Sequence, residues 1–108
     1  MMTEYSISYI TIGNMGFEEK EKEVLESIAE AVLEDMEEEL IITEVRYEKW
    51  GINNIEVVIA TKEADFNSYN YLRVRSLAKK LGVSFTFDVT PKDEHTLIVE
   101  YRFRPLRW

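Results

Sequence analysis

Residues 41–61, IITEVRYEKWGINNIEVVIAT, carry the strongest structural signal in this chain. Ile41–Trp50 and Ile55–Thr61 are rich in β-branched and aromatic residues, which favour strands. The segment between them, Gly51-Ile52-Asn53-Asn54, has the composition of a turn. The sequence therefore predicts a β-hairpin near the middle of the chain.

Before the hairpin, a strand and a long helix are expected. Tyr5–Ile12 (YSISYITI) alternates and is rich in β-branched and aromatic residues, and the segment Gly13-Asn14-Met15-Gly16 interrupts it. From Phe17 to about Leu40 the apolar residues recur with helical spacing in a single stripe, and most of the remaining positions are Glu. The stripe consists of Val24, Leu25, Ile28, Ala29, Val32, Met36 and Leu40.

After the hairpin, the pattern predicts a second helix and two strands. Asp65 is a suitable N-cap for a helix over Phe66–Leu81, and Gly82 stands where helices commonly end. Val83–Thr90 and Thr96–Arg104 then alternate between apolar and polar residues, as half-buried strands do.

The expected order is β-α-β-β-α-β-β, which indicates one α+β domain over residues 1–108. We expect a ferredoxin-like split βαβ sandwich, with both helices on one face of a five-stranded antiparallel sheet. The uncovered second face would carry apolar side chains, which favours a homodimer formed face to face or edge to edge. Those side chains are Ile41 or Ile42, Val58, Ala60 and Ile98.

Composition excludes several kinds of chemistry. The chain has no cysteine, which excludes disulfides, thiol catalysis and cysteine-bound zinc, and its only histidine is His95. No catalytic, cofactor-binding or metal-binding residue is assigned, and no cofactor is expected. The start lacks the pattern of a secretory signal and no apolar run is long enough for a membrane span, so a cytoplasmic location is expected. The chain has 17 Glu and no Gln, a composition typical of proteins from hyperthermophiles.

The charge is divided unevenly along the chain. The net charge is −8, but residues 1–44 carry −11 and residues 45–108 carry +3. Acidic side chains in the last turn of the predicted first helix are each disfavoured by the helix dipole by about 0.3–1 kcal/mol. They form either a solvated face balanced by the basic second helix, or a docking surface for a basic partner or a second copy. The residues assigned to this acidic surface are Glu30, Glu34, Glu37, Glu38 and Glu39.

Basic residues in the second half form an alternative surface for nucleic acid. The tail interleaves arginines with aromatic rings, as surfaces that bind phosphates and stack bases do. However, strand alternation places Tyr101 and Phe103 on the face opposite Arg102 and Arg104, which favours a role in the core for the rings. The candidate contacts are Arg73, Arg75, Lys79, Lys80, Arg102, Arg104, Arg107 and Trp108.

Three functions remain open from the sequence. The leading hypothesis is a non-enzymatic protein–protein interaction module whose acidic helix engages a basic partner or a second copy. An acidic inhibitor that mimics nucleic acid is one form of it. The alternative is an RNA- or DNA-binding domain, and the third is small-molecule binding or catalysis in a dimer cleft. Trp50, Tyr69 and Tyr71 are candidate aromatic contacts for any interface.

Overall fold

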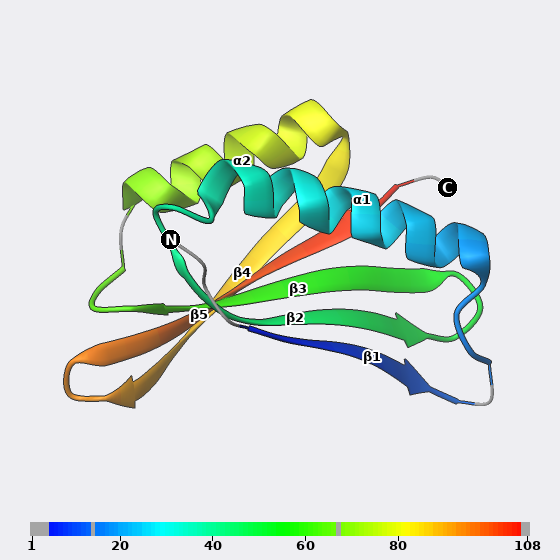
Figure 1. Ribbon diagram of the computed structural model, residues 1–108, viewed down its shortest axis with the longest axis horizontal. Helices are drawn as coiled ribbons and strands as arrows, with labels where there is room; N and C mark the ends of the chain where they lie inside the picture. The colour runs from blue at the N-terminus through cyan, green and yellow to red at the C-terminus, as the bar shows by residue number, and fades with distance from the viewer. Residues whose placement is uncertain (1–4, 14, 67, 107–108) are drawn as a thin grey trace.

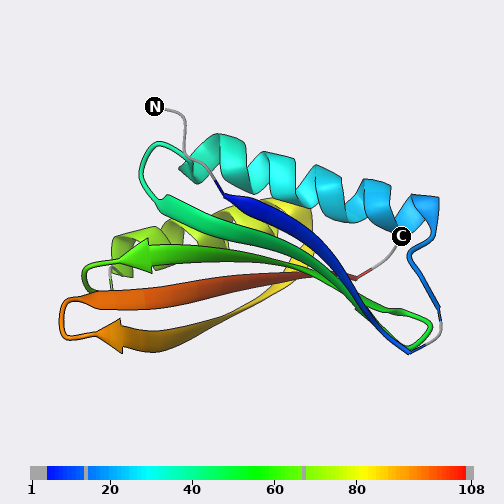
Figure 2. The same cartoon turned by 60° about the horizontal axis from the view of Figure 1, so that its bottom comes forward.

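The computed structural model describes residues 5–13, 15–66 and 68–106. Seven elements follow the predicted order, and the two helices lie on the same side of the sheet (Figures 1 and 2). They are β1 (Ser6–Ile12), α1 (Glu19–Met36), β2 (Ile41–Trp50), β3 (Asn54–Glu63), α2 (Ser68–Leu81), β4 (Val83–Asp93) and β5 (Thr96–Pro105).

The sheet is mixed, and the prediction of an antiparallel sheet was wrong. Its strand order is β1-β2-β3-β5-β4, and β1 pairs with β2 in parallel, whereas the other neighbours are antiparallel. The second half has a split βαβ arrangement, because β5 lies between the parallel strands β3 and β4. The first half does not, because α1 returns the chain to the position directly beside β1. A crossover of this kind makes the two strands parallel.

Helix α1 buries the predicted apolar stripe against the sheet. Leu25, Ile28 and Val32 are buried together with Ala29 and Met36. They join core side chains from β2, β3 and β5, including Tyr101 and Phe103, which share a face of β5 as predicted. The neighbours Arg102 and Arg104 point to the opposite face of the sheet, away from α1 and α2 (Figure 1).

Helix α1 is shorter than predicted at both ends. It runs over Glu19–Met36 rather than Phe17–Leu40, so the three consecutive glutamates at 37–39 follow the helix instead of forming its last turn. Since carboxylates oppose the dipole at a helix C-terminus, an end at Met36 is physically reasonable. Leu40 is still buried, and its backbone N–H donates to the carbonyl of Met36 at 2.9 Å.

The remaining boundaries differ from the predictions by a few residues. Gly82 follows α2 with φ +69°, the left-handed conformation expected of a glycine after a helix. Phe66 precedes α2 rather than opening it, and its ring stacks on that of Phe87 at 5.4 Å. The last hairpin is longer than predicted, because β4 continues through Pro91 to Asp93 with a register irregularity between those residues. Proline is tolerated there because β4 is an edge strand.

Candidate functional site

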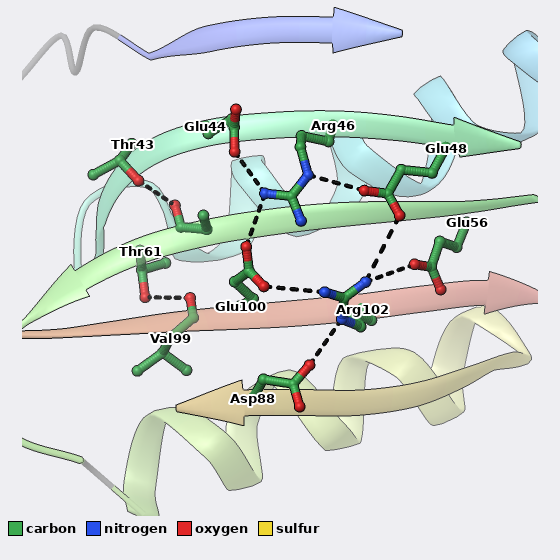
Figure 3. A network of polar contacts seen from close by, with 11 residues as sticks. Thr43, Glu44, Arg46, Glu48, Glu56, Thr61, Asp88, Val99, Glu100 and Arg102 are labelled. Atoms are coloured by element: carbon green, nitrogen blue, oxygen red, sulfur yellow. Dashed lines mark hydrogen bonds and ion pairs between the residues drawn. The ribbon is translucent and has the colours of Figure 1, made fainter. Parts of the chain in front are cut away.

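The middle of the sheet face opposite the helices carries a network of ion pairs (Figure 3). Arg46 on β2 contacts the carboxylates of Glu44 at 2.6 Å, Glu48 at 2.9 Å and Glu100 at 2.8 Å. Burial alone would lower the pKa of the Arg46 guanidinium, but these three carboxylates outweigh that effect and raise it. Arg46 is therefore a largely buried side chain that stays positively charged.

A second arginine continues this network along β5. Arg102 contacts Glu56 at 2.8 Å, Asp88 at 2.9 Å and Glu100 at 3.0 Å (Figure 3). Arg104 also contacts Glu56 at 3.3 Å, and its guanidinium lies over the ring of Trp50 at 5.1 Å. Burial and the neighbouring Glu48 raise the pKa of the Glu56 carboxyl, although both arginines act in the opposite direction.

This network covers the middle of the second face, where uncovered apolar side chains were predicted, whereas the predicted Ile41, opposite Lys62, is 60% exposed. Val58 lies on that face between Arg46 and Arg102 in cross-strand register, and it is fully buried. Ala60 lies between Glu44 and Glu100 in the same way. Long charged side chains bury apolar neighbours under their aliphatic stems. Ile42 belongs to the core cluster rather than to this face.

Three of the six predicted nucleic-acid contacts that the structure describes are paired with carboxylates of the same chain. Arg102 and Arg104 belong to the network above, and Arg73 on α2 pairs with Asp35 at 3.3 Å and with Glu39. The other α2 candidates, Arg75, Lys79 and Lys80, are exposed and form no ion pair with the described residues. Arg107 and Trp108 lie outside the described residues.

The predicted acidic surface is divided into two parts. Glu39 is neutralised by Arg73, as the interpretation of counter-charge within one monomer expects. Glu30, Glu34 and Glu38 are exposed and Glu37 is half-buried, and none of these four forms an ion pair with a described residue. The uncompensated negative charge therefore lies on the body of α1 and in the turn that follows it.

A groove runs between α1 and the outer strand β1. We call it the β1–α1 groove, and its cavity volume is about 240 Å³. Apolar and aromatic side chains line most of it, and Glu26 and Glu30 supply its carboxylates. Its lining residues are Tyr5, Ile7, Tyr9, Glu26, Ala29, Glu30, Leu33, Val45 and Tyr47.

The tyrosines of the groove lie in a negative electrostatic field. The ring of Tyr9 stacks on that of Tyr47 at 4.8 Å, and its hydroxyl donates to Glu26 Oε2 at 3.0 Å. Burial, followed by the charges of Tyr9, Glu26 and other neighbours including Glu30, raises the pKa of Tyr47 to about 12. Lys22 lies over the Tyr9 ring with its Nζ 5.5 Å from the centroid, so a cation is already present beside this ring. A further cation beside the groove carboxylates Glu26 and Glu30 would be electrostatically favoured.

A buried ion pair holds the start of α1 in place. Lys49 and Glu21 are 1% and 2% exposed, and Lys49 Nζ contacts Glu21 Oε1 at 2.6 Å and the carbonyl of Gly16 at 3.1 Å. Burial disfavours the Glu21 carboxylate, but the N–H of Glu18 and the Lys49 ammonium outweigh burial and lower its pKa. The pair therefore ties β2, the β1–α1 loop and α1 together.

Sequence reasoning missed the groove residues Ile7, Tyr9 and Glu26. A strand without charges, such as YSISYITI, is typical of a buried strand, yet β1 is at the edge of the sheet. β1 is exposed because the strand order places it at the edge of the sheet, and its own sequence does not reveal that position. Of the three aromatic candidates, Tyr69 is exposed, whereas Tyr71 packs on Phe87 at 4.8 Å and Trp50 lies under Arg104.

The described part of the chain shows no candidate metal site. It holds no cluster of three or more metal-ligating side chains, and His95 is exposed in the β4–β5 turn. No helix among the described residues is long and apolar enough to cross a bilayer. Neither protein-family models nor curated protein sequences match this chain. Its function is therefore inferred from the charges, exposure and grooves of the protein surface.

Proposed function

We propose that this protein is a non-enzymatic protein–protein interaction module that binds a basic partner along α1. The observation that carries the proposal is the row of carboxylates beside the β1–α1 groove. Glu26, Glu30 and Glu34 recur every four residues, which places them on one side of the helix. Glu30 and Glu34 have no ion-pair partner among the described residues.

The distribution of charge elsewhere supports a basic rather than an acidic partner. The sheet arginines Arg46 and Arg102 are each surrounded by carboxylates, so they offer little free positive charge to an incoming molecule. Arg75, Lys79 and Lys80 on α2 remain exposed and unpaired among the described residues, but the uncompensated charge on α1 is negative, in keeping with the net charge of −8. Complementary charge raises the association rate and disfavours partners of like charge.

Exposed apolar side chains next to the carboxylates can contribute binding free energy when a partner covers them. Ile7 is 57% exposed and Tyr9 is 46% exposed, and both line the groove together with Leu33. Exposed pairs of charges contribute only about 0.2–1 kcal/mol each, whereas burial of apolar area contributes about 25 cal/mol per Å². A partner would therefore gain selectivity from the row of glutamates and much of its affinity from the groove.

Binding of a fluorescent octalysine peptide to the full chain, followed by anisotropy at low and moderate salt, tests the proposal. We expect the double variant Glu30→Gln/Glu34→Gln to weaken binding about tenfold, because two exposed ion pairs are lost. The matched control Glu23→Gln/Glu94→Gln removes the same charge from exposed positions outside the row and should change affinity less than twofold. Equal effects of the two variants would show that only net charge matters and would contradict a defined site.

A further inference from the structure

The outer edge of β1 is open for strand pairing. β1 pairs only with β2, so along Ser6–Ile12 the other edge has no partner strand among the described residues. Alternate residues of an edge strand direct both N–H and C=O outward. Natural edge strands are commonly protected by charges, proline or bulges. β1 has no charged residue and no proline, and its register with β2 is uninterrupted.

We propose that the basic partner docks as an extended segment that pairs with β1 as a sixth strand of the sheet. This inference rests on the proposed function and specifies how the partner is held. Backbone hydrogen bonds to the free edge would supply affinity, and side chains on alternate positions would supply selectivity, as in other cases of strand addition.

The two faces of β1 define the sequence pattern that such a segment would carry. Ile7 and Tyr9 point to the side of α1, whereas Ile10 and Ile12, at 40% and 70% exposed, point to the other side. A strand added beside β1 alternates its side chains in the same way. Residues toward α1 would lay aliphatic stems on Ile7 and Tyr9, and residues on the other side would be apolar.

The spacing of the glutamates matches the spacing of side chains on an extended strand. Glu26, Glu30 and Glu34 are four residues apart, which corresponds to about 6 Å along the axis of α1. Side chains on one face of a strand repeat at about 6.6–6.8 Å. Successive basic side chains of the added strand can therefore each approach a glutamate of this row. The expected partner segment alternates Lys or Arg with apolar residues.

A second copy of this chain fits the site less well than a basic segment. Antiparallel pairing of β1 with β1 of another copy about a two-fold axis keeps both α1 helices on the same side of the joined sheet. The rows containing Glu26 and Glu30 would then face each other across the seam. Moreover, Ser6–Ile12 carries no basic residue to pair with either row. Like charges across an interface are unfavourable.

The test compares labelled peptides of about eight residues for binding to the full chain. The peptides are alternating lysine and valine, a block peptide of the same composition, and the alternating peptide with N-methyl groups on the residues of one edge. We expect the alternating peptide to bind at least tenfold more tightly than the other two. Hydrogen exchange should slow in β1 when it binds, and it should not slow in β4.

The outcomes separate this inference from the proposed function. Equal binding of alternating, block and N-methylated peptides, still weakened by Glu30→Gln, would overturn strand addition and leave the acidic surface supported. Absence of binding by every basic peptide would overturn both. A dimer of the free protein that Ile10→Lys converts to a monomer would show that a second copy occupies the edge, and would overturn the inference in that way.

Discussion

The two edge strands of the sheet, β1 and β4, differ in the features that protect an edge against pairing. β1 is free of charge, has no bulge, and exposes apolar side chains on both faces. β4 carries Asp88 and Lys92, contains Pro91, and has a register irregularity close to its end. These are the devices by which natural proteins prevent unwanted strand pairing. One edge is protected against pairing and the other is not, which is consistent with the proposal that a partner pairs with β1.

The two edges also differ in how they are attached to the core. Behind β4, the rings of Phe66, Tyr71, Phe85 and Phe87 form a cluster between α2 and the sheet, with Phe85 reaching the Phe103 ring at 5.6 Å. Behind β1, α1 leaves a groove, and a buried ion pair holds the start of the helix. The β4 edge is thus backed by a cluster of rings, whereas the β1 edge is backed by a groove beside a helix whose start is held by a polar anchor, the Lys49–Glu21 pair.

Breaking the polar anchor should have the largest effect. Lys49→Ala leaves the Glu21 carboxylate buried without a cation, and we expect a loss of about 3–5 kcal/mol in the free energy of unfolding. Urea unfolding followed by circular dichroism measures it. The double variant Glu21→Leu/Lys49→Met replaces the pair with apolar groups and should recover most of the loss. Equal destabilisation of both variants would mean that the charges themselves do not matter.

Truncating a ring behind β4 should be the next largest effect. Phe85→Ala removes a half-buried ring that packs on Phe87, Tyr101 and Phe103, and we expect a loss of about 2–3 kcal/mol, toward the lower end of the range for core truncations. Val89→Ala on the exposed part of β4 is the control, with a change below about 0.5 kcal/mol. Thermal unfolding of both variants measures these losses. A similar loss in Phe85→Ala and Val89→Ala would mean that strand propensity, and not ring packing, stabilises this edge.

Most of the fold could be predicted from the sequence, but the arrangement that creates the candidate site could not. The apolar stripe of α1, the helix end at Gly82 and the buried face of Tyr101 and Phe103 follow from local sequence patterns and are observed. Strand order depends on where α1 returns the chain, which no local pattern encodes. The exposure of β1 was therefore not predicted, and Val58, which is buried, was predicted to lie on an uncovered face. The arginine network that covers Val58 requires knowledge of cross-strand partners.

The pH dependence of stability should distinguish the Lys49–Glu21 ion pair from the ring cluster behind β4. The folded-state pKa of Glu21 is lowered, so its contribution is present above the unfolded-state pKa and is lost as pH falls through the folded-state value. We expect the free energy of unfolding to decrease as pH falls from about 5 to about 2, and less steeply in Glu21→Leu/Lys49→Met than in the wild type. Phe85→Ala should keep the wild-type slope, because it removes no titrating group. Parallel slopes in all three proteins would place the acid-sensitive groups elsewhere.

Placing a charge on each edge should give the smallest effect on stability and the most direct comparison of the two edges. Ile10→Lys puts a cation on β1 opposite Glu48, and Thr90→Lys puts one on the exposed end of β4. Both substitutions are at the surface and should change the free energy of unfolding by less than about 0.5 kcal/mol. Aggregation at a temperature below unfolding, measured by light scattering, should nevertheless slow several-fold in Ile10→Lys and hardly change in Thr90→Lys, because only β1 lacks a charge that prevents pairing. A similar response of the two variants would show that β1 is no more open to pairing than β4, and the free edge would then lose its functional meaning.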